Sequence, residues 1–297
     1  MIALAIHHRT NYHYGVRMDF GPHRLMLRPR ESRNLQLIEH DLTLQPKGSV
    51  TWAHDVFGNA VATATFQEPS DTLCIESTAM LELDTEQWPV FEVTASAAKF
   101  PFLLTDDDMA DLGALRLQGY LDIHGRLRTW TRSFVAGDPT DTLSLLKDIC
   151  AGIAASFSYE TREDEGTQTP EQTIERKSGS CRDFAVLFVD AVRSLGFGAR
   201  IVSGYLYDPN QNMLGSAGTG STHAWAEVYV PGAGWITFDP TNRSVGGFNL
   251  IPVAVARDIR QVIPITGSFV GPLGEIVGMD VDVRVSPIEP RISNGKI

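Results

Sequence analysis

Residues 178–206, SGSCRDFAVLFVDAVRSLGFGARIVSGYL, carry the clearest structural pattern in the chain. Ser180 suits the N-cap of a helix, with Asp183 three residues later as the second half of a capping box. Gly196 and Gly198 suit its C-terminal end. Apolar residues recur at helical spacing on one face: Phe184, Leu187, Phe188, Ala191, Val192 and Leu195. The pattern predicts a helix with Cys181 in its first turn, followed by a strand over ARIVSGYLY.

The segments on either side of this helix predict an α+β fold. Residues 222–230, THAWAEVYV, alternate strictly, with His223 and Trp225 on one face. PGAG then turns the chain, and WITFD returns as a second strand that ends at Asp239. Upstream, PTDTLSLLKDICAGIAASFSY has helical spacing, with Asp141 as its N-cap. A polar, acidic loop with a short helix after Pro170 joins this segment to the Cys181 helix.

The first 130 residues favour β-structure. IALAIHHRTNYHY and LQLIEHDLTLQP alternate between apolar and polar residues, and HDVFGNAVATATF places Gly58-Asn59 between two apolar runs, as in a hairpin turn. We expect an antiparallel sandwich or open barrel. The stretch FPFLLTDDDMADLGALRLQGYLD is expected to form an irregular connection, so the domain boundary is placed near residue 130.

The composition limits the classes of protein and partner. The chain has 297 residues, with 43% hydrophobic residues and a net charge of −11, and its length suggests two domains. An acidic surface without basic runs argues against nucleic acid as a partner. Three cysteines, too few and too far apart for a disulfide framework, indicate reduced thiols. Without a signal peptide or an apolar run of the roughly 20 residues that a membrane span needs, we expect a cytoplasmic protein and no membrane partner.

The position of Cys181 is chemically favourable for a nucleophile. Unpaired N–H groups and the positive end of the helix dipole favour the thiolate and can stabilise an oxyanion. His223 is the one histidine that follows this cysteine, and Asp239 is the carboxylate best placed to orient its ring. The simplest hairpin places Asp239 opposite residue 224, so a bulge or strong twist is expected to bring His223 and Asp239 together.

Other interpretations of these residues stay open at this point. Cys181 and His223 could be core residues, and Asp239 before a proline could begin a turn. All three could also bind zinc, although the prediction is that the chain has no metal site. Alternatively, the chain could be a binding module without activity. A second oxyanion donor is sought in Gln168 or Tyr159, and Trp225 is a candidate for the wall of a substrate groove.

The blocks GSCRDFAVLFVDAVRSLGFGARIVSGYL and THAWAEVYVPGAGWITFDPTN resemble the core of transglutaminase-like proteins, within the papain-like cysteine enzymes. HHRTNYHYGVRMDFGPHRLMLRPRE with DVFGN resembles the N-terminal region that precedes this core in bacterial members. The resemblance implies Cys181 as nucleophile, His223 as base and Asp239 as the residue that orients it. It also divides the chain into a β-rich domain, residues 1–130, and a catalytic domain with a C-terminal β extension, residues 131–297.

The family resemblance also implies the reaction class, which is acyl transfer through a thioester. Hydrolysis of a peptide, isopeptide or γ-glutamyl-type amide is favoured. The alternatives are a protein-glutamine transglutaminase that uses an amine acceptor, and a non-catalytic binding module with a retained triad. No EF-hand-like loop is present in the sequence, so neither calcium nor another cofactor is expected. The resemblance further implies a peptide or protein amide substrate and a possible link to ATP-grasp-type ligases.

Overall fold

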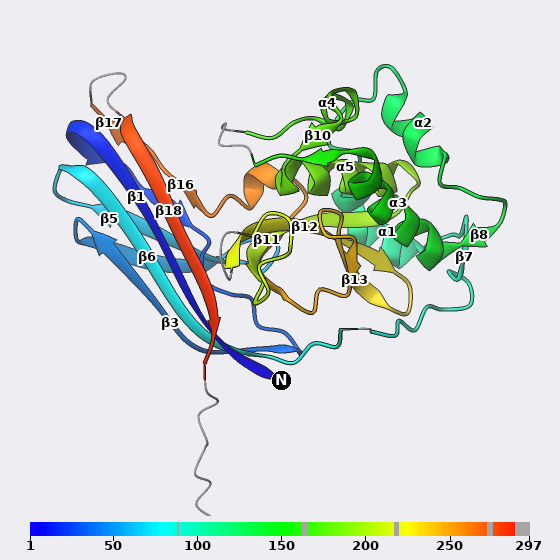
Figure 1. Cartoon of the computed structure of the whole chain (residues 1–297), viewed down its shortest axis with the longest axis horizontal. Helices are drawn as coiled ribbons and strands as arrows, with labels where there is room; N and C mark the ends of the chain where they lie inside the picture. Colours follow the sequence, from blue (N-terminus) through cyan, green and yellow to red (C-terminus); the bar gives the residue numbers. More distant parts are fainter. Residues whose placement is uncertain (88, 162–165, 217–219, 272–275, 289–297) are drawn as a thin grey trace, which may run out of the picture.

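The computed structural model of the protein describes residues 1–87, 89–161, 166–216, 220–271 and 276–288. A β-rich half and a mixed half that carries the helices lie side by side (Figure 1). No helix among these described residues is both long and apolar enough to cross a membrane. The α+β prediction is confirmed.

The β-rich half is a sandwich of two antiparallel sheets, one of the two forms predicted. The first sheet comprises β17 (Phe269–Val270) and β18 (Ile276–Pro287), which both pair with β1 (Ile2–Phe20), then β6 (Ser70–Leu83) and β3 (Leu35–Gln45). The second runs in the order β16 (Ile265–Thr266), β2 (His23–Leu25), β5 (Ala60–Phe66) and β4 (Gly48–His54). Alternate side chains of both sheets form one apolar cluster between them, which includes Met18, Leu25, Ala62, Ala64, Leu73 and Ile75.

The C-terminal strands complete this sandwich. β18 pairs with β1 over most of its length, β17 pairs with the end of β1, and β16 pairs with β2. The sequence-based division counted these strands as a C-terminal β extension of the second domain, whereas their backbone pairing adds them to the sheets of the N-terminal strands. Each extends an edge that the N-terminal strands alone would leave without backbone partners.

The second half is built on a five-stranded antiparallel sheet. Its order is β14 (Ser244–Val245), β13 (Gly234–Asp239), β12 (Gly220–Val230), β11 (Gly198–Tyr207) and β15 (Leu250–Ala256). Helix α5 (Cys181–Ser194) packs on this sheet, and its predicted apolar stripe is buried in the main core. The upstream helix α3 (Thr142–Ser156) has the predicted cap, since the Asp141 carboxylate accepts from the backbone N–H of Ser144 at 3.0 Å. Helix α4 (Pro170–Arg176) follows Pro170 as expected.

The connection between the halves is more regular than predicted. It contains α1 (Asp106–Leu112), a 3-10 turn η1 (Gly113–Arg116) and α2 (Arg126–Arg132), and β7 (Lys99–Phe100) pairs with β8 (Thr140–Asp141). Two turns of helix are too short to show a convincing apolar period. Gly198 is not a helix cap: it begins β11, and a Cβ there would lie 2.8 Å from the Leu112 side chain. Gly196, with a φ of +96°, ends α5 as expected.

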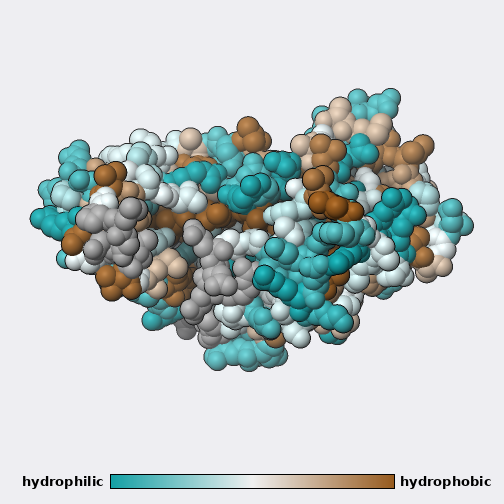
Figure 2. All heavy atoms as spheres, turned by 90° about the horizontal axis from the view of Figure 1, so that it is seen from above, coloured by the Kyte–Doolittle hydropathy of each residue, from teal (hydrophilic) through white to brown (hydrophobic). Residues whose placement is uncertain are grey.

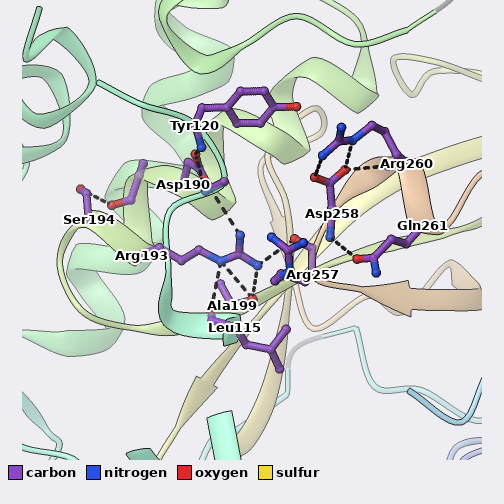
Figure 3. A network of polar contacts seen from close by, with 12 residues as sticks. Leu115, Tyr120, Asp190, Arg193, Ser194, Ala199, Arg257, Asp258, Arg260 and Gln261 are labelled. Carbon is purple, nitrogen blue, oxygen red and sulfur yellow. Dashed lines mark hydrogen bonds and ion pairs between the residues drawn. The ribbon is translucent and has the colours of Figure 1, made fainter. Parts of the chain in front are cut away.

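A buried ion pair fixes the C-terminal half of α5 (Figure 3). Asp190 accepts hydrogen bonds from the backbone N–H groups of Gly119 and Tyr120 and lies 3.5 Å from Arg193. Arg193 in turn donates to the backbone carbonyl oxygens of Ala199 and Arg257. Both charges are less than 5% exposed, so these partners offset the cost of burying them. The network holds the start of β11 and the end of β15 at one end of α5.

The DVFGN segment fastens the two halves together. The predicted hairpin forms between β4 and β5, and Asp55 accepts from the backbone N–H groups of Phe57 and Asn59 in its turn. Asn59 is fully buried against β15, where its side chain donates to the carbonyl of Val255 and accepts from the N–H of the same residue. One amide side chain therefore replaces the backbone of a neighbouring strand.

Replacing Asn59 with alanine should lower the free energy of unfolding by about 2–4 kcal/mol, because the buried N–H and C=O of Val255 lose their partners. Urea unfolding followed by tryptophan fluorescence measures this change. Asn34→Ala is the matched control, since Asn34 is exposed in a turn of the same half. Equal stability of the two variants would contradict the role of Asn59 in joining the halves.

Candidate active site

A cavity of about 1050 Å³ lies between the two halves. Cys181, His223 and Tyr159 line it from the mixed half, and Tyr12 and Phe269 line it from the sandwich. In Figure 2, hydrophobic side chains lie in the hollow between the β-rich half, on the left, and the half that carries the helices. The cavity therefore places the predicted nucleophile against a surface from the other half of the molecule.

The loop before α5 holds Cys181 at the first position of the helix. The buried Asp183 carboxylate accepts from the backbone N–H of Gln168 at 2.7 Å, and from the N–H and hydroxyl of Ser180 at 2.8 and 2.9 Å. The capping box predicted for Ser180 and Asp183 is present. A Cβ on Gly179 would lie 2.9 Å from the Asp183 side chain, so only glycine allows this close approach. Cys181 is half-buried and has a free thiol.

His223 lies on β12 with each ring nitrogen in a different environment. Its Nε2 is 2.9 Å from Oδ2 of Asp239, and both side chains are fully buried. Its Nδ1 is also buried and has no hydrogen bond of ordinary geometry among the described residues. Nδ1 is therefore the nitrogen available to Cys181, which interacts with the imidazole.

The strand register brings His223 and Asp239 near each other without a bulge in the paired part of β12 and β13, where a bulge or a strong twist was expected. β12 and β13 pair without a shift, with Ala226 opposite Phe238 and Tyr229 opposite Trp235. Continued by one pair, this register places Asp239 opposite residue 225, two positions from His223. Because this offset is two residues, the side chains of His223 and Asp239 lie on the same face of the sheet. Diagonal neighbours on one face are close enough for long side chains to touch.

The interactions of the three groups favour a charged pair at the thiol and the imidazole. Burial raises the pKa of Cys181, but the neighbouring His223 and the backbone N–H of Ala224 together hold it below its ordinary value. Burial also disfavours the imidazolium of His223, yet the carboxylate of Asp239 and the thiolate raise its pKa. The pKa of Asp239 is lowered despite its burial, because His223 and Asn242 stabilise the carboxylate. The thiolate and the imidazolium therefore stabilise each other, so both charged forms are favoured relative to the isolated groups.

Sequence reasoning missed Asn242, which joins Asp239 to the loop above the imidazole. Its Nδ2 donates to Oδ2 of Asp239 at 2.9 Å, and its Oδ1 accepts from the backbone N–H of Leu214. The next residue after Leu214, Gly215, has a φ of +79°, and a Cβ there would lie 3.5 Å from Nδ1 of His223. Asn242 directly follows the DPT block in the sequence, but its contacts with a distant loop have no local pattern.

Of the three other candidate residues, Tyr159, Gln168 and Trp225, only Tyr159 lines the cavity. Its hydroxyl lies near the position of a Gly215 Cβ, at 3.0 Å. Gln168 does not point into the cavity, because its side-chain nitrogen donates to the Ser178 carbonyl and to Asp183. The prediction that Trp225 forms a groove wall is also wrong: it is buried behind His223, with the two rings stacked 6.1 Å apart.

The arrangement of the ring nitrogens argues against the zinc hypothesis. Asp239 occupies Nε2, whereas Cys181 interacts with the imidazole from the side of the cavity. The carboxylate and the thiol therefore interact with different nitrogens of the ring, and the three groups do not face one common position where a zinc ion could bind. Within the described ranges, no group of three or more potential ligands is arranged to hold a metal ion.

Comparisons with known proteins agree with this geometry. Residues 128–240 match the model of the transglutaminase-like superfamily, and residues 4–82 match the bacterial transglutaminase-like N-terminal region. An uncharacterised protein of Mycobacterium tuberculosis is 29% identical over 295 residues, which cover 95% of this chain and 92% of that protein. A protein-glutamine gamma-glutamyltransferase of Pseudomonas aeruginosa is 28% identical over 93 residues, 30% of this chain and 13% of the relative.

A solved structure shares the whole fold. The crystal structure of a candidate cysteine protease from Cytophaga hutchinsonii superimposes with a TM-score of 0.73 at 19% identity, over 97% of this chain and 91% of that one. The sheet, the cysteine-bearing helix and the histidine strand thus define a papain-like fold. Residues 128–240 form a transglutaminase-like core, and the bacterial transglutaminase-like N-terminal region precedes it.

The pKa directions predict how the reactivity of Cys181 depends on pH. A lowered thiol pKa keeps the thiolate populated at pH values where a free thiol, with a pKa of about 8.5, is protonated. Iodoacetamide should therefore alkylate Cys181 at pH 6 at least about tenfold faster than N-acetylcysteine. In Asp239→Asn the imidazolium loses its carboxylate, so the acid limb of the rate profile should move to higher pH. Stopped-flow or mass-spectrometric rates from pH 4 to 9 test both shifts, and coincident profiles would contradict them.

Proposed function

We propose that the protein hydrolyses an amide through a thioester on Cys181, with His223 as the proton carrier and Asp239 as the residue that orients it. The observation that carries this proposal is that the two ring nitrogens of His223 have different surroundings. Nε2 is bound to a buried carboxylate, while Nδ1 is left for a thiol at a helix N-terminus that opens into a cavity. A thiolate there can reach a carbonyl carbon.

The residues of the site can carry each step. The Cys181 thiolate attacks the carbonyl carbon, and the π electrons of the carbonyl move onto its oxygen. The backbone N–H of Cys181, which has no partner within α5 because it lies in the first turn, and the hydroxyl of Tyr159 donate to that oxyanion. His223 transfers a proton from Nδ1 to the nitrogen, and the C–N bond breaks to release an amine. Water then gives a proton to His223 and attacks the thioester, which frees the acid and the thiolate.

Transfer to an amine is the second candidate, and the Pseudomonas aeruginosa relative named as a gamma-glutamyltransferase supports it. The same thioester would then be attacked by a primary amine in place of water. The two reactions differ only in what reaches the thioester second, so they share all the residues above. Once a substrate that acylates Cys181 is known, cadaverine is added as the amine acceptor. Mass spectrometry of the products then gives the ratio of the acid, formed by hydrolysis, to the amide, formed by transfer.

The first test is intact-mass analysis after brief exposure to iodoacetamide at pH 6. The wild type should gain one fast adduct, which is absent from Cys181→Ala and forms at least about tenfold more slowly in His223→Ala. Cys74→Ala is the matched control, because Cys74 is a second half-buried thiol and its loss should leave the fast adduct intact. Slow, equal labelling of the wild type and His223→Ala would favour a binding module over an enzyme.

Tyr159→Phe separates oxyanion stabilisation from thiol activation. Loss of the hydroxyl should slow turnover of an amide substrate by about 10- to 100-fold, because the tetrahedral intermediate loses a donor. Alkylation by iodoacetamide develops no oxyanion, so its rate should stay near that of the wild type. Tyr229→Phe on β12 serves as the control, since that hydroxyl donates to Asp108 outside the cavity. Equal turnover of the two variants would remove Tyr159 from the mechanism.

A further inference from the structure

The cavity wall opposite Cys181 and His223 comes from the sandwich and from the segment that crosses to it after β15. We call it the apolar wall, and it comprises Tyr12, Tyr14, His23, Ile263, Ile265 and Phe269. Tyr12 and Tyr14 lie on β1, and the last three belong to the segment that leads into β16 and β17. Its members thus come from both ends of the chain.

Strand pairing and packing within the fold hold this wall in place. β16 pairs with β2, β17 pairs with β1, and the carbonyl of Pro264 accepts from the N–H of Met26 at 2.8 Å. The rings of Tyr14 and Phe269 pack 5.3 Å apart. A surface fixed in this way needs little ordering to bind a side chain, which reduces the entropic cost of binding.

The wall exposes apolar surface and carries no charge. Ile263 is 41% exposed and Phe269 is 39% exposed, although both lie within a concave surface. Exposed apolar groups in a cavity are typical of a ligand site. Its one titratable imidazole, His23, is buried, and burial lowers the pKa of that group so that it is neutral at pH 7. A charged side chain would lose hydration against this surface and would find no group of opposite charge within the wall.

Polar groups occupy the other side of the same cavity. The hydroxyls of Thr161, Thr167 and Thr222 line it and can bond to peptide groups. At the rim, Arg260 is engaged by Asp258, which accepts from its Nε at 2.9 Å and its Nη2 at 2.6 Å (Figure 3). This pairing offsets the positive charge of Arg260, so that residue gives no preference for an anionic substrate.

We propose that the apolar wall is the specificity site of the enzyme and binds an aromatic or branched aliphatic side chain of a peptide substrate, next to the amide that Cys181 attacks. The inference rests on the proposed function and adds the substrate class to it. The β-rich half thereby acts as the part of the protein that selects the substrate. The cavity, at about 1050 Å³, slightly exceeds the range of about 300–1,000 Å³ for small-molecule sites, so it has room for more than one residue.

Chloromethyl ketones of N-acetylated Phe, Leu, Asp and Lys test this preference by alkylating the thiol. The rate of adduct formation on Cys181 is measured by intact mass, corrected for reactivity with free cysteine, and divided by the iodoacetamide rate of the same preparation. We expect the Phe and Leu ratios to exceed the Asp and Lys ratios by at least about tenfold. Equal ratios for all four probes overturn the proposal.

A matched pair of variants tests whether the preference for apolar probes comes from the apolar wall. Ile263→Ala should lower the Phe ratio by about fivefold, because apolar contact with the probe is lost. Ile38→Ala removes the same atoms from β3 at a similar exposure, 46%, outside the cavity, and should stay within twofold of the wild type. Phe269→Ala is a second variant of the wall and should act in the same direction as Ile263→Ala.

The outcomes separate this proposal from the one it rests on. If iodoacetamide labels Cys181 rapidly but the four chloromethyl ketones give equal ratios, the proposed thiol chemistry is retained and the specificity site is overturned. Equal Phe ratios for Ile263→Ala and Ile38→Ala likewise overturn the specificity site alone. Failure of iodoacetamide itself to label Cys181 rapidly overturns both proposals.

Discussion

The hydrogen bond between Nε2 of His223 and Oδ2 of Asp239 is the interaction on which the site depends. Both groups are fully buried, and either charge alone would be costly there. Asn242 and the backbone N–H of Thr241 satisfy the remaining acceptor positions of the carboxylate. With Nε2 fixed, Nδ1 is the ring nitrogen left for the thiol of Cys181, so the position of one carboxylate sets the orientation of the imidazole.

That pair is useful only because the molecule builds a cavity around it. The chain passes from β15 back to the sandwich, where β16, β17 and β18 join sheets begun by the N-terminal strands. The buried Asn59 locks the same junction by binding the backbone of Val255. The two halves therefore share a hydrophobic core at their contact, and residues of both line the cavity.

The fold and the reaction rest on different observations. The family models identify a transglutaminase-like core and the bacterial N-terminal region, and the superimposed structure shows the shared fold. One fold of this kind can serve proteolysis or transamidation, because both use the same thioester and differ in the second nucleophile. In our proposal, the groups that select the substrate lie mainly outside the helix and strands that carry the triad, on the wall that the sandwich contributes.

The helix at Cys181, the strands of His223 and Asp239 and the sandwich could all be predicted from the amino-acid sequence, because apolar period and capping residues are local properties. The sequence also placed Cys181 and Asp239 at element ends, whereas His223, expected to begin its strand, lies inside β12. The register that puts His223 and Asp239 on one face became known only from the folded chain, since a shift of one residue reverses every side chain. The same is true of the contacts that join Phe269 to Tyr14 and Asn242 to Leu214, because they depend on how distant segments pack and leave no period in the sequence.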